Sequence, residues 1–223
     1  MNECFRRNIG ALTGPEQELL LTKKAVIIGC GGLGCYSAEF LARIGIGRLT
    51  LVDGDIFSVS NLNRQLNSLE TNLGKNKAME TKNRLLGIRA GLSIEAVETI
   101  LTEENAEELL KGHDIIIDAL DNIKTRLLVE KTADKLGITL VHGAVEGWCA
   151  QVCTVFPGDF TLSKLYQGKK EFDEPSVLSF TPAFCASVQV SEAVKVLLNR
   201  TDLLRKKLFT ASLKDNTFMI IEL

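Results

Sequence analysis

Residues 25–34 read AVIIGCGGLG, and this stretch is the strongest indicator of the fold. The apolar run 25–29 has the length of a buried strand, and helical spacing follows over 33–44. A Gly-x-Gly-x-x-Gly turn between strand and helix lets the backbone approach a phosphate, which the free N–H groups of the helix N-terminus then bind. The stretch predicts a Rossmann-like unit that binds a nucleotide through its glycines, Gly29, Gly31, Gly32 and Gly34.

Strand and helix patterns alternate downstream of this stretch. Further strands are predicted at 48–53, 94–100, 114–119 and 138–143, with helices at 75–87, 103–110 and 122–136, and Thr102 as a cap of the second of these helices. This alternation is typical of an α/β protein with a doubly wound, mostly parallel sheet that helices cover on both faces.

The C-terminal part has a different pattern. Residues 150–156 predict an antiparallel strand, and 208–213 with 218–222 predict a terminal hairpin. Between them we expect a long irregular connection, the crossover loop 157–180, followed by a helix over 181–199 with Pro182 in its first turn. A capping box at Thr13–Glu16 predicts a short helix near the N-terminus. We expect a single domain over residues 1–223.

Composition excludes several classes of protein. The 223 residues carry a net charge of −2, which gives no general attraction to nucleic acid or to anionic membranes. No apolar run approaches the roughly 20 residues that span a bilayer, and the first ten residues lack the apolar stretch of a signal peptide. The six scattered cysteines do not form a secreted disulfide framework. These properties favour a cytoplasmic protein.

Polar residues after the glycine motif indicate which nucleotide is bound. Asp53, at the end of the second strand, is placed to bind ribose hydroxyls. Arg64 and Lys77 supply positive charge, which a triphosphate needs and a hydride-transferring site does not. Asp121 follows the fourth strand, where it can hold Mg²⁺ or cap the next helix. We expect ATP with Mg²⁺.

Four motifs in this order form a specific combination. They read GCGGLG from Gly29, DGDIFSVSNLNRQ from Asp53, GKNKA from Gly74 and DNIKTR from Asp121. Together they resemble the ThiF/MoeB/HesA enzymes and the adenylation half of ubiquitin-activating enzymes, over about residues 5–199. The glycine motif alone would not be specific.

The resemblance implies a reaction and a set of roles. In that family the C-terminal carboxylate of a ubiquitin-like carrier ending in Gly-Gly attacks the α-phosphate of ATP and releases pyrophosphate. Carried over to matching positions, the ATP site would comprise Gly32, Asp53, Asp55, Ser60, Asn61, Arg64, Gln65, Lys77, Asp121 and Asn122. Arg7 resembles an N-terminal arginine that reaches into the other subunit, which implies a homodimer. Catalytic roles would fall to Arg7, Arg64, Lys77 and Asp121, with Asp121 as the metal ligand.

Departures from the family pattern limit the prediction. Relatives often hold structural zinc with two Cys-x-x-Cys pairs, whereas Cys149 and Cys153 are spaced Cys-x-x-x-Cys and no cysteine follows Cys185. A closed zinc site needs four ligands, so we expect none. The crossover loop has no cysteine, so covalent transfer to the carrier is not expected.

Other readings remain open. One alternative is adenylation of a different carboxylate, such as one on a modified tRNA base, and another is a nucleotide-binding module without catalysis. An NAD-dependent dehydrogenase is a more distant alternative. The cysteines favour packing roles over chemistry. His113 and His142 have no partner apparent in the sequence, and His142 is expected to be half-buried. Trp148 either lines a channel for the carrier's tail or packs in the core.

Overall fold

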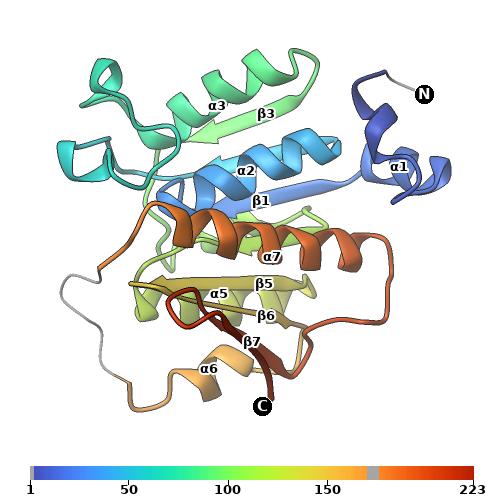
Figure 1. The fold of residues 1–223 in the computed structure, drawn as a ribbon, viewed down its shortest axis with the longest axis vertical. Helices are drawn as coiled ribbons and strands as arrows, with labels where there is room; N and C mark the ends of the chain where they lie inside the picture. Colours follow the sequence, from blue (N-terminus) through green and yellow to red (C-terminus); the bar gives the residue numbers. More distant parts are fainter. Residues whose placement is uncertain (1–2, 170–175) are drawn as a thin grey trace.

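The computed structural model describes residues 3–169 and 176–223, which form one eight-stranded sheet (Figure 1). The strands are β1 Lys24–Ile28, β2 Arg48–Val52, β3 Ser93–Val97, β4 Ile115–Asp118, β5 Leu140–Glu146, β6 Cys149–Val155, β7 Lys207–Ser212 and β8 Thr217–Glu222. Their order is β3-β2-β1-β4-β5-β6-β7-β8. Strands β1 to β5 pair in parallel and β5 to β8 pair antiparallel. This confirms the predicted mostly parallel sheet with antiparallel C-terminal strands.

Helices cover both faces of the sheet (Figure 1). They are α1 Gly14–Leu20, α2 Gly32–Ile44, α3 Lys77–Ile88, α4 Ala106–Leu110, α5 Ile123–Leu136, α6 Thr161–Leu165 and α7 Phe180–Leu197, with short 3-10 turns at Glu3–Asn8, Val59–Asn61 and Glu70–Asn72. Helices α2, α3 and α7 pack together on one face, and α4, α5 and α6 pack together on the other. One apolar core lies on each side. Because β1 and β4 are covered on both faces, their apolar runs are continuous rather than alternating.

Two predicted helix starts shift for a local reason. The helix expected at 103–110 begins at Ala106, so Thr102 does not cap it; Asn105 occupies the cap position. The helix expected from Lys75 begins at Lys77, because the side chain of Asn76 accepts the N–H of Met79. The capping box at Thr13 and Glu16 is confirmed, with both reciprocal hydrogen bonds present.

The expectation of an irregular loop over 157–180 was wrong for part of it. Residues Thr161–Leu165 form α6, and residues 170–175 lie outside the described part. The N-terminus of α6 is capped from a different helix, because the carboxylate of Glu130 on α5 accepts the N–H groups of Leu162 and Ser163 at 2.6 and 2.8 Å. A cap 32 residues away leaves no local signal in the sequence.

The topology of the sheet reverses between β1 and β4, and the glycine motif lies there. Gly29 ends β1 with φ of +93°, and a Cβ at this position would lie 2.7 Å from the carbonyl oxygen of Ala119, just after β4. In α2, a Cβ at Gly34 would overlap the carbonyl oxygen of Gly29. The phosphate-binding turn and the end of β4 are therefore in direct contact, which requires glycine at both positions.

Replacing Gly34 with alanine is expected to destabilise the protein by about 3 kcal/mol, because the added methyl group meets backbone that cannot move without separating α2 from β1. Urea unfolding followed by circular dichroism measures this. Gly91→Ala is the matched control, since nothing lies within 4 Å of a Cβ at that position. Equal unfolding midpoints for the two variants would contradict the expectation.

Candidate nucleotide and adenylation site

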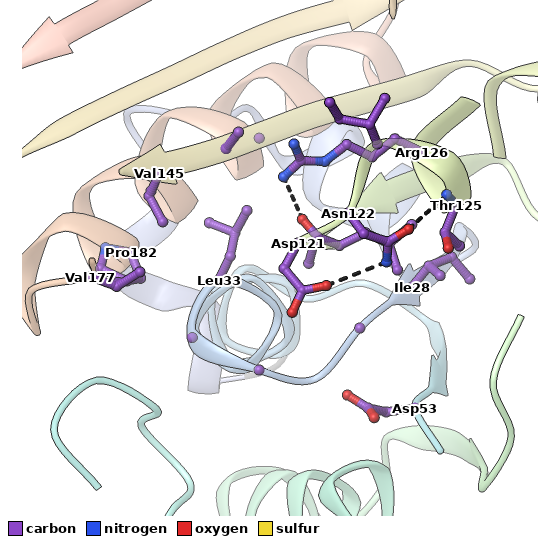
Figure 2. Close-up of a pocket in the computed structure, with 18 of the residues that line it drawn as sticks. Ile28, Leu33, Asp53, Asp121, Asn122, Thr125, Arg126, Val145, Val177 and Pro182 are labelled. Atoms are coloured by element: carbon purple, nitrogen blue, oxygen red, sulfur yellow. Dashed lines mark hydrogen bonds between the residues drawn. The ribbon is translucent and has the colours of Figure 1, made fainter. Parts of the chain in front are cut away.

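A cavity of about 860 Å³ opens at the carboxyl ends of the parallel strands, beside the N-terminus of α2 (Figure 2). This is where ligands of doubly wound sheets bind. Most of the predicted site residues line it, namely Gly29, Gly31, Gly32, Asp53, Asp55, Ser60, Arg64, Gln65, Lys77, Asp121 and Asn122. Four separate sequence motifs thus converge on one space.

The glycine turn forms one wall of this cavity. Gly31 occupies the N-cap position of α2, and no side chain caps that helix. Its first N–H groups therefore remain available, with the positive end of the helix dipole behind them. Gly31 and Gly32 both line the cavity. The arrangement suits a phosphate group.

Asp53 is held rigidly at the end of β2. Its two carboxylate oxygens accept the backbone N–H groups of Cys30 at 2.6 Å and Asp55 at 2.8 Å. A carboxylate offers about four acceptor positions, so two remain for ribose hydroxyls. Burial raises the pKa of Asp53, and this is only partly offset by the two N–H groups and the ammonium of Lys77. Further hydrogen-bond donors, such as ribose hydroxyls, would therefore stabilise the charged form of this carboxylate.

Lys77 is a buried cation of the site. Its residue is 8% exposed, and its Nζ lies 3.0 Å from Oδ2 of Asp55, whose side chain is 66% exposed. One of three ammonium protons is used in this pair, leaving two for an anionic ligand. Lys77 is therefore not a solvated surface charge.

Arg64 and Gln65 border the glycine turn. The guanidinium of Arg64 donates to the carbonyl oxygen of Ser60 at 2.7 Å and to Oδ1 of Asn63 at 2.9 Å, which fixes it at the cavity wall. Gln65 is 7% exposed, and its Oε1 is buried without a protein partner. A buried amide oxygen without a partner costs free energy that a ligand donor would recover.

The Asp121 carboxylate stands on the turn between β4 and α5 (Figure 2). Asn122 caps α5 by accepting the N–H of Thr125 at 2.8 Å, so the cap role considered for Asp121 belongs to its neighbour. Asn122 also donates to Oδ1 of Asp121 at 3.4 Å. Asp121 itself is exposed toward the cavity. One accessible carboxylate beside a phosphate site fits Mg²⁺, which binds through one or two carboxylates, water and phosphate oxygens.

Three predicted site residues lie away from the cavity wall. Gly34 lies within α2 under the turn. Asn61 is buried and accepts the N–H of Ser58 through Oδ1, so it shapes the loop. Arg7 is exposed in the N-terminal 3-10 turn, which Asn8 attaches to the carbonyl of Ile44 at the C-terminal end of α2. The opposite end of α2 faces the cavity.

Sequence reasoning missed several contributors. Gln151 and Tyr166 line the cavity without any motif to mark them, and Arg126 belonged to a motif but had no assigned role. His142 was expected to be half-buried, and the sequence did not reveal its partners; it is fully buried and bound by Asp118 and Tyr166. The sequence separation of these partners, 24 residues in each case, hid the contacts.

The cysteines and Trp148 divide between core and surface. Cys30, Cys35, Cys153 and Cys185 are buried, as expected for packing residues. Cys149 is exposed and lines the cavity, so its packing assignment was wrong. It lies at the start of β6, where the strand leaves the covered part of the sheet. Trp148 is 44% exposed and stacks on Phe180, with ring centroids 5.1 Å apart, so it is not a core residue.

Metal-binding and membrane-spanning features were also sought. Across residues 3–169 and 176–223, no group of three or more His, Cys, Asp or Glu side chains is placed to hold a metal ion. The expectation of no zinc stays a prediction. Within the same part of the chain, no helix has the length and apolar character needed to cross a bilayer.

The fold and the site define a nucleotide-binding enzyme of the Rossmann-like class. The family model described as the ThiF family matches residues 5–223, and the chain belongs to this family. It is 34% identical over 215 residues to the SAMP-activating enzyme E1 of Haloferax volcanii, covering 92% of this chain and 78% of that protein. It is 36% identical over 200 residues to the sulfur carrier protein ThiS adenylyltransferase of Bacillus subtilis, covering 86% of this chain.

A solved structure confirms the fold. The crystal structure of E. coli MccB superposes with a TM-score of 0.88 at 19% identity, covering 98% of this chain and 69% of that one. The chain spans 60% of the length of the ThiS adenylyltransferase.

Proposed function

We propose that this chain adenylates the C-terminal glycine carboxylate of a ubiquitin-like sulfur-carrier protein, using ATP and releasing pyrophosphate. The main support is the buried ammonium of Lys77, which opens on the same cavity as the uncapped N-terminus of α2. A leaving pyrophosphate needs such a fixed cation, whereas hydride transfer does not. The names of the two similar adenylating enzymes point the same way.

The proposed reaction needs no protein nucleophile. The carrier's terminal carboxylate oxygen attacks the α-phosphorus, a P–O bond to the carrier forms, and the bond to the β-phosphate oxygen breaks. The residues contribute position and charge. Asp53 binds the ribose, the glycine turn and α2 bind phosphate oxygens, and Lys77 with Arg64 stabilises the charge on departing pyrophosphate. Gln65 helps to orient the phosphates.

Asp121 would hold Mg²⁺ in this scheme. When bound, the ion neutralises charge on phosphate oxygens as pyrophosphate leaves. Asn122 orients the carboxylate through its hydrogen bond to Oδ1, and Asp121 lines the cavity. The protein's contribution is therefore a fixed carboxylate at the edge of the phosphate site.

We also propose that the whole chain acts as one adenylation domain, with its crossover loop within 157–180. Val145, Cys149 and Val177 line the same cavity as the nucleotide-site residues, and we infer that an extended glycine tail binds beside them. None of the cysteines is needed in this scheme, so the product is the acyl-adenylate itself.

The free state of the six thiols supports a reducing, cytoplasmic location, and we infer no nucleic-acid or membrane partner.

A homodimer is part of the proposal. Arg7 is exposed at the end of α2 far from its own cavity, since the 13 residues of α2 span about 20 Å. A catalytic Arg7 would therefore have to act in the site of a second copy. In a two-fold dimer each protomer then completes its neighbour.

Mixing two inactive variants tests this arrangement. Arg7→Ala and Lys77→Ala are each expected to be nearly inactive alone. When equal amounts are mixed and re-equilibrated, about half of the dimers are mixed, and each mixed dimer has one intact site of its two. The mixture is therefore expected to recover about a quarter of the wild-type rate. Arg6→Ala in place of Arg7→Ala is the matched control and should be active alone; Arg6 pairs with Glu3. No recovery from dimers of demonstrated mixed composition would contradict sharing of the site.

ATP–pyrophosphate exchange tests the function itself. Purified protein is assayed with Mg²⁺, with and without candidate carriers that end in Gly-Gly. We expect exchange only when a carrier is present, with loss of exchange when the terminal glycine is deleted. Binding of ATP without exchange for any carrier would reject the proposal, and exchange with a small or RNA-borne carboxylate would identify the other substrate class.

A further inference from the structure

A chain of buried polar side chains lies under the cavity and is not used in the scheme above. Nδ1 of His142 lies 2.6 Å from Oδ2 of Asp118, and both residues are fully buried. The hydroxyl of Tyr166 lies 3.0 Å from Nε2 of His142. The same hydroxyl lies 2.9 Å from NH1 of Arg126 and 2.9 Å from Nε2 of Gln151. Helix α5, the end of α6 and strands β5 and β6 therefore meet at one hydroxyl group, and β4 joins them through the contact of Asp118 with His142.

The protons in this chain have one consistent arrangement. Arg126 and Gln151 both donate to the hydroxyl oxygen of Tyr166 and fill its two lone pairs. The hydroxyl hydrogen is then directed to Nε2 of His142, which must accept it. The proton of the neutral ring is therefore on Nδ1, and it is donated to Asp118. Burial lowers the pKa of His142, which agrees with a neutral ring, and raises the pKa of Tyr166 to about 12.

This arrangement holds the turn that carries Asp121. Oδ1 of Asp118 accepts the N–H of Leu120 at 3.0 Å, and the guanidinium of Arg126 donates to the carbonyl oxygen of Leu120 (Figure 2). The residue immediately before Asp121 is therefore bound through both its N–H and its C=O. Gln189 of α7 donates to the carbonyl oxygen of Asp118 at 2.8 Å and anchors the start of the turn.

Stability alone does not account for these residues. Burying Asp118 and Arg126 carries a desolvation cost, and well-packed apolar residues of similar volume are often as stable or more stable. Their ion pair is long, with Nε of Arg126 at 3.9 Å from Oδ2 of Asp118 and without a hydrogen-bond partner. Arg126, Gln151 and Tyr166 also line the cavity. The polar chain thus borders the site that it supports.

We propose that Asp118, His142 and Tyr166 are positioning residues. Together with Arg126 they fix the Leu120–Asp121 peptide for adenylation. Through its hydroxyl group, Tyr166 ties the segment carrying α6 to the proposed metal-binding turn. The inference rests on the proposed function. None of the three touches the reacting atoms in this scheme. Their effect passes through the orientation of the Asp121 carboxylate.

Tyr166→Phe is the first test, because it removes one oxygen and keeps the ring. We expect kcat for exchange to fall about tenfold, the Mg²⁺ concentration for half-maximal rate to rise, and KM for the carrier to stay within about twofold. Tyr36→Phe is the matched control, since Tyr36 is the other tyrosine of the chain and packs on Phe40. It should leave all three values unchanged.

Asp118→Asn tests the direction of the protons. An asparagine NH₂ facing Nδ1 of His142 moves the ring proton to Nε2, so the Tyr166 oxygen then faces three donors with two lone pairs. We expect kcat to fall about thirtyfold and the ¹⁵N shifts of His142 to exchange between the two ring nitrogens. With two histidines in the chain, a His113→Gln variant assigns the spectrum.

The double variant decides between positioning and simple packing. If the residues act as one unit, Asp118→Asn combined with Tyr166→Phe lowers kcat little further than Asp118→Asn alone. A fall in melting temperature with unchanged kcat and Mg²⁺ dependence in the single variants would overturn the proposal, as would a His142 proton on Nε2 in the wild type.

Failure of the proposed function would be distinguishable. If the wild type shows no exchange with any carrier, the histidine spectra still test the proton arrangement, and calorimetric ATP binding with and without Mg²⁺ replaces kcat. If Mg²⁺ no longer tightens ATP binding in Tyr166→Phe and Asp118→Asn but still does so in Tyr36→Phe, the positioning role is supported. If Mg²⁺ tightens ATP binding equally in all three variants, the positioning role is rejected.

Discussion

Lys77→Ala is expected to lower carrier-dependent exchange by about a thousandfold. The ammonium is nearly buried, it is held by Asp55, and it faces the phosphate end of the cavity, where a charge is worth more than in water. ATP binding should weaken much less than kcat falls, because the charge on pyrophosphate develops as the bond breaks. Exchange kinetics and calorimetric ATP affinity measure the two effects.

Stability should not explain the loss in Lys77→Ala. Its partner Asp55 is largely exposed and can be rehydrated when the lysine is gone, so the melting temperature should change little. Lys75→Ala removes an exposed lysine two residues away and serves as the control. An equal effect on kcat in both variants would contradict a specific role for Lys77.

Asp121→Asn is expected to reduce exchange roughly several hundredfold at low Mg²⁺, because the amide keeps the shape of the side chain but supplies a poorer metal ligand. Part of the rate should return at high Mg²⁺ concentration. Titrating exchange against Mg²⁺ for wild type and variant measures the shift in half-maximal concentration.

A remote carboxylate supplies the control for Asp121→Asn. Asp202 is exposed beyond the C-terminal end of α7, so Asp202→Asn should leave the Mg²⁺ titration unchanged. If Asp121→Asn lowers the rate by the same factor at every Mg²⁺ concentration, Asp121 acts otherwise than as a metal ligand.

The centre of the sheet could be predicted from the sequence because β1, β2 and β4 are short apolar runs that are buried along almost their whole length. The four residues of β4 are buried and form an uninterrupted apolar run ending in Asp118, a pattern that a covered parallel strand requires. The glycine motif predicted the turn between β1 and α2, since its steric demand is local. Helix α6 could not be predicted because its cap comes from Glu130.

The candidate site was predictable to the extent that its residues lie in motifs. Asp53, Lys77 and Asp121 each follow a strand or open a helix at a recognisable position, and all three line one cavity. Tyr166 and Gln151 have no such signal, because their importance arises from a shared contact across 15 residues. Distances along the chain do not reveal which buried polar groups meet in space.

The direct contact between Gly29 and Ala119 also has a consequence for folding kinetics. Strands β1 and β4 pair in parallel, with Ala25 opposite Ile115, so about 90 residues of chain must emerge and fold back before the site exists. Non-local parallel pairing of this kind is slow to form. During synthesis, residues 29–34 should remain unable to bind ATP until β4 has left the ribosome, and nucleotide affinity should then appear in one cooperative step.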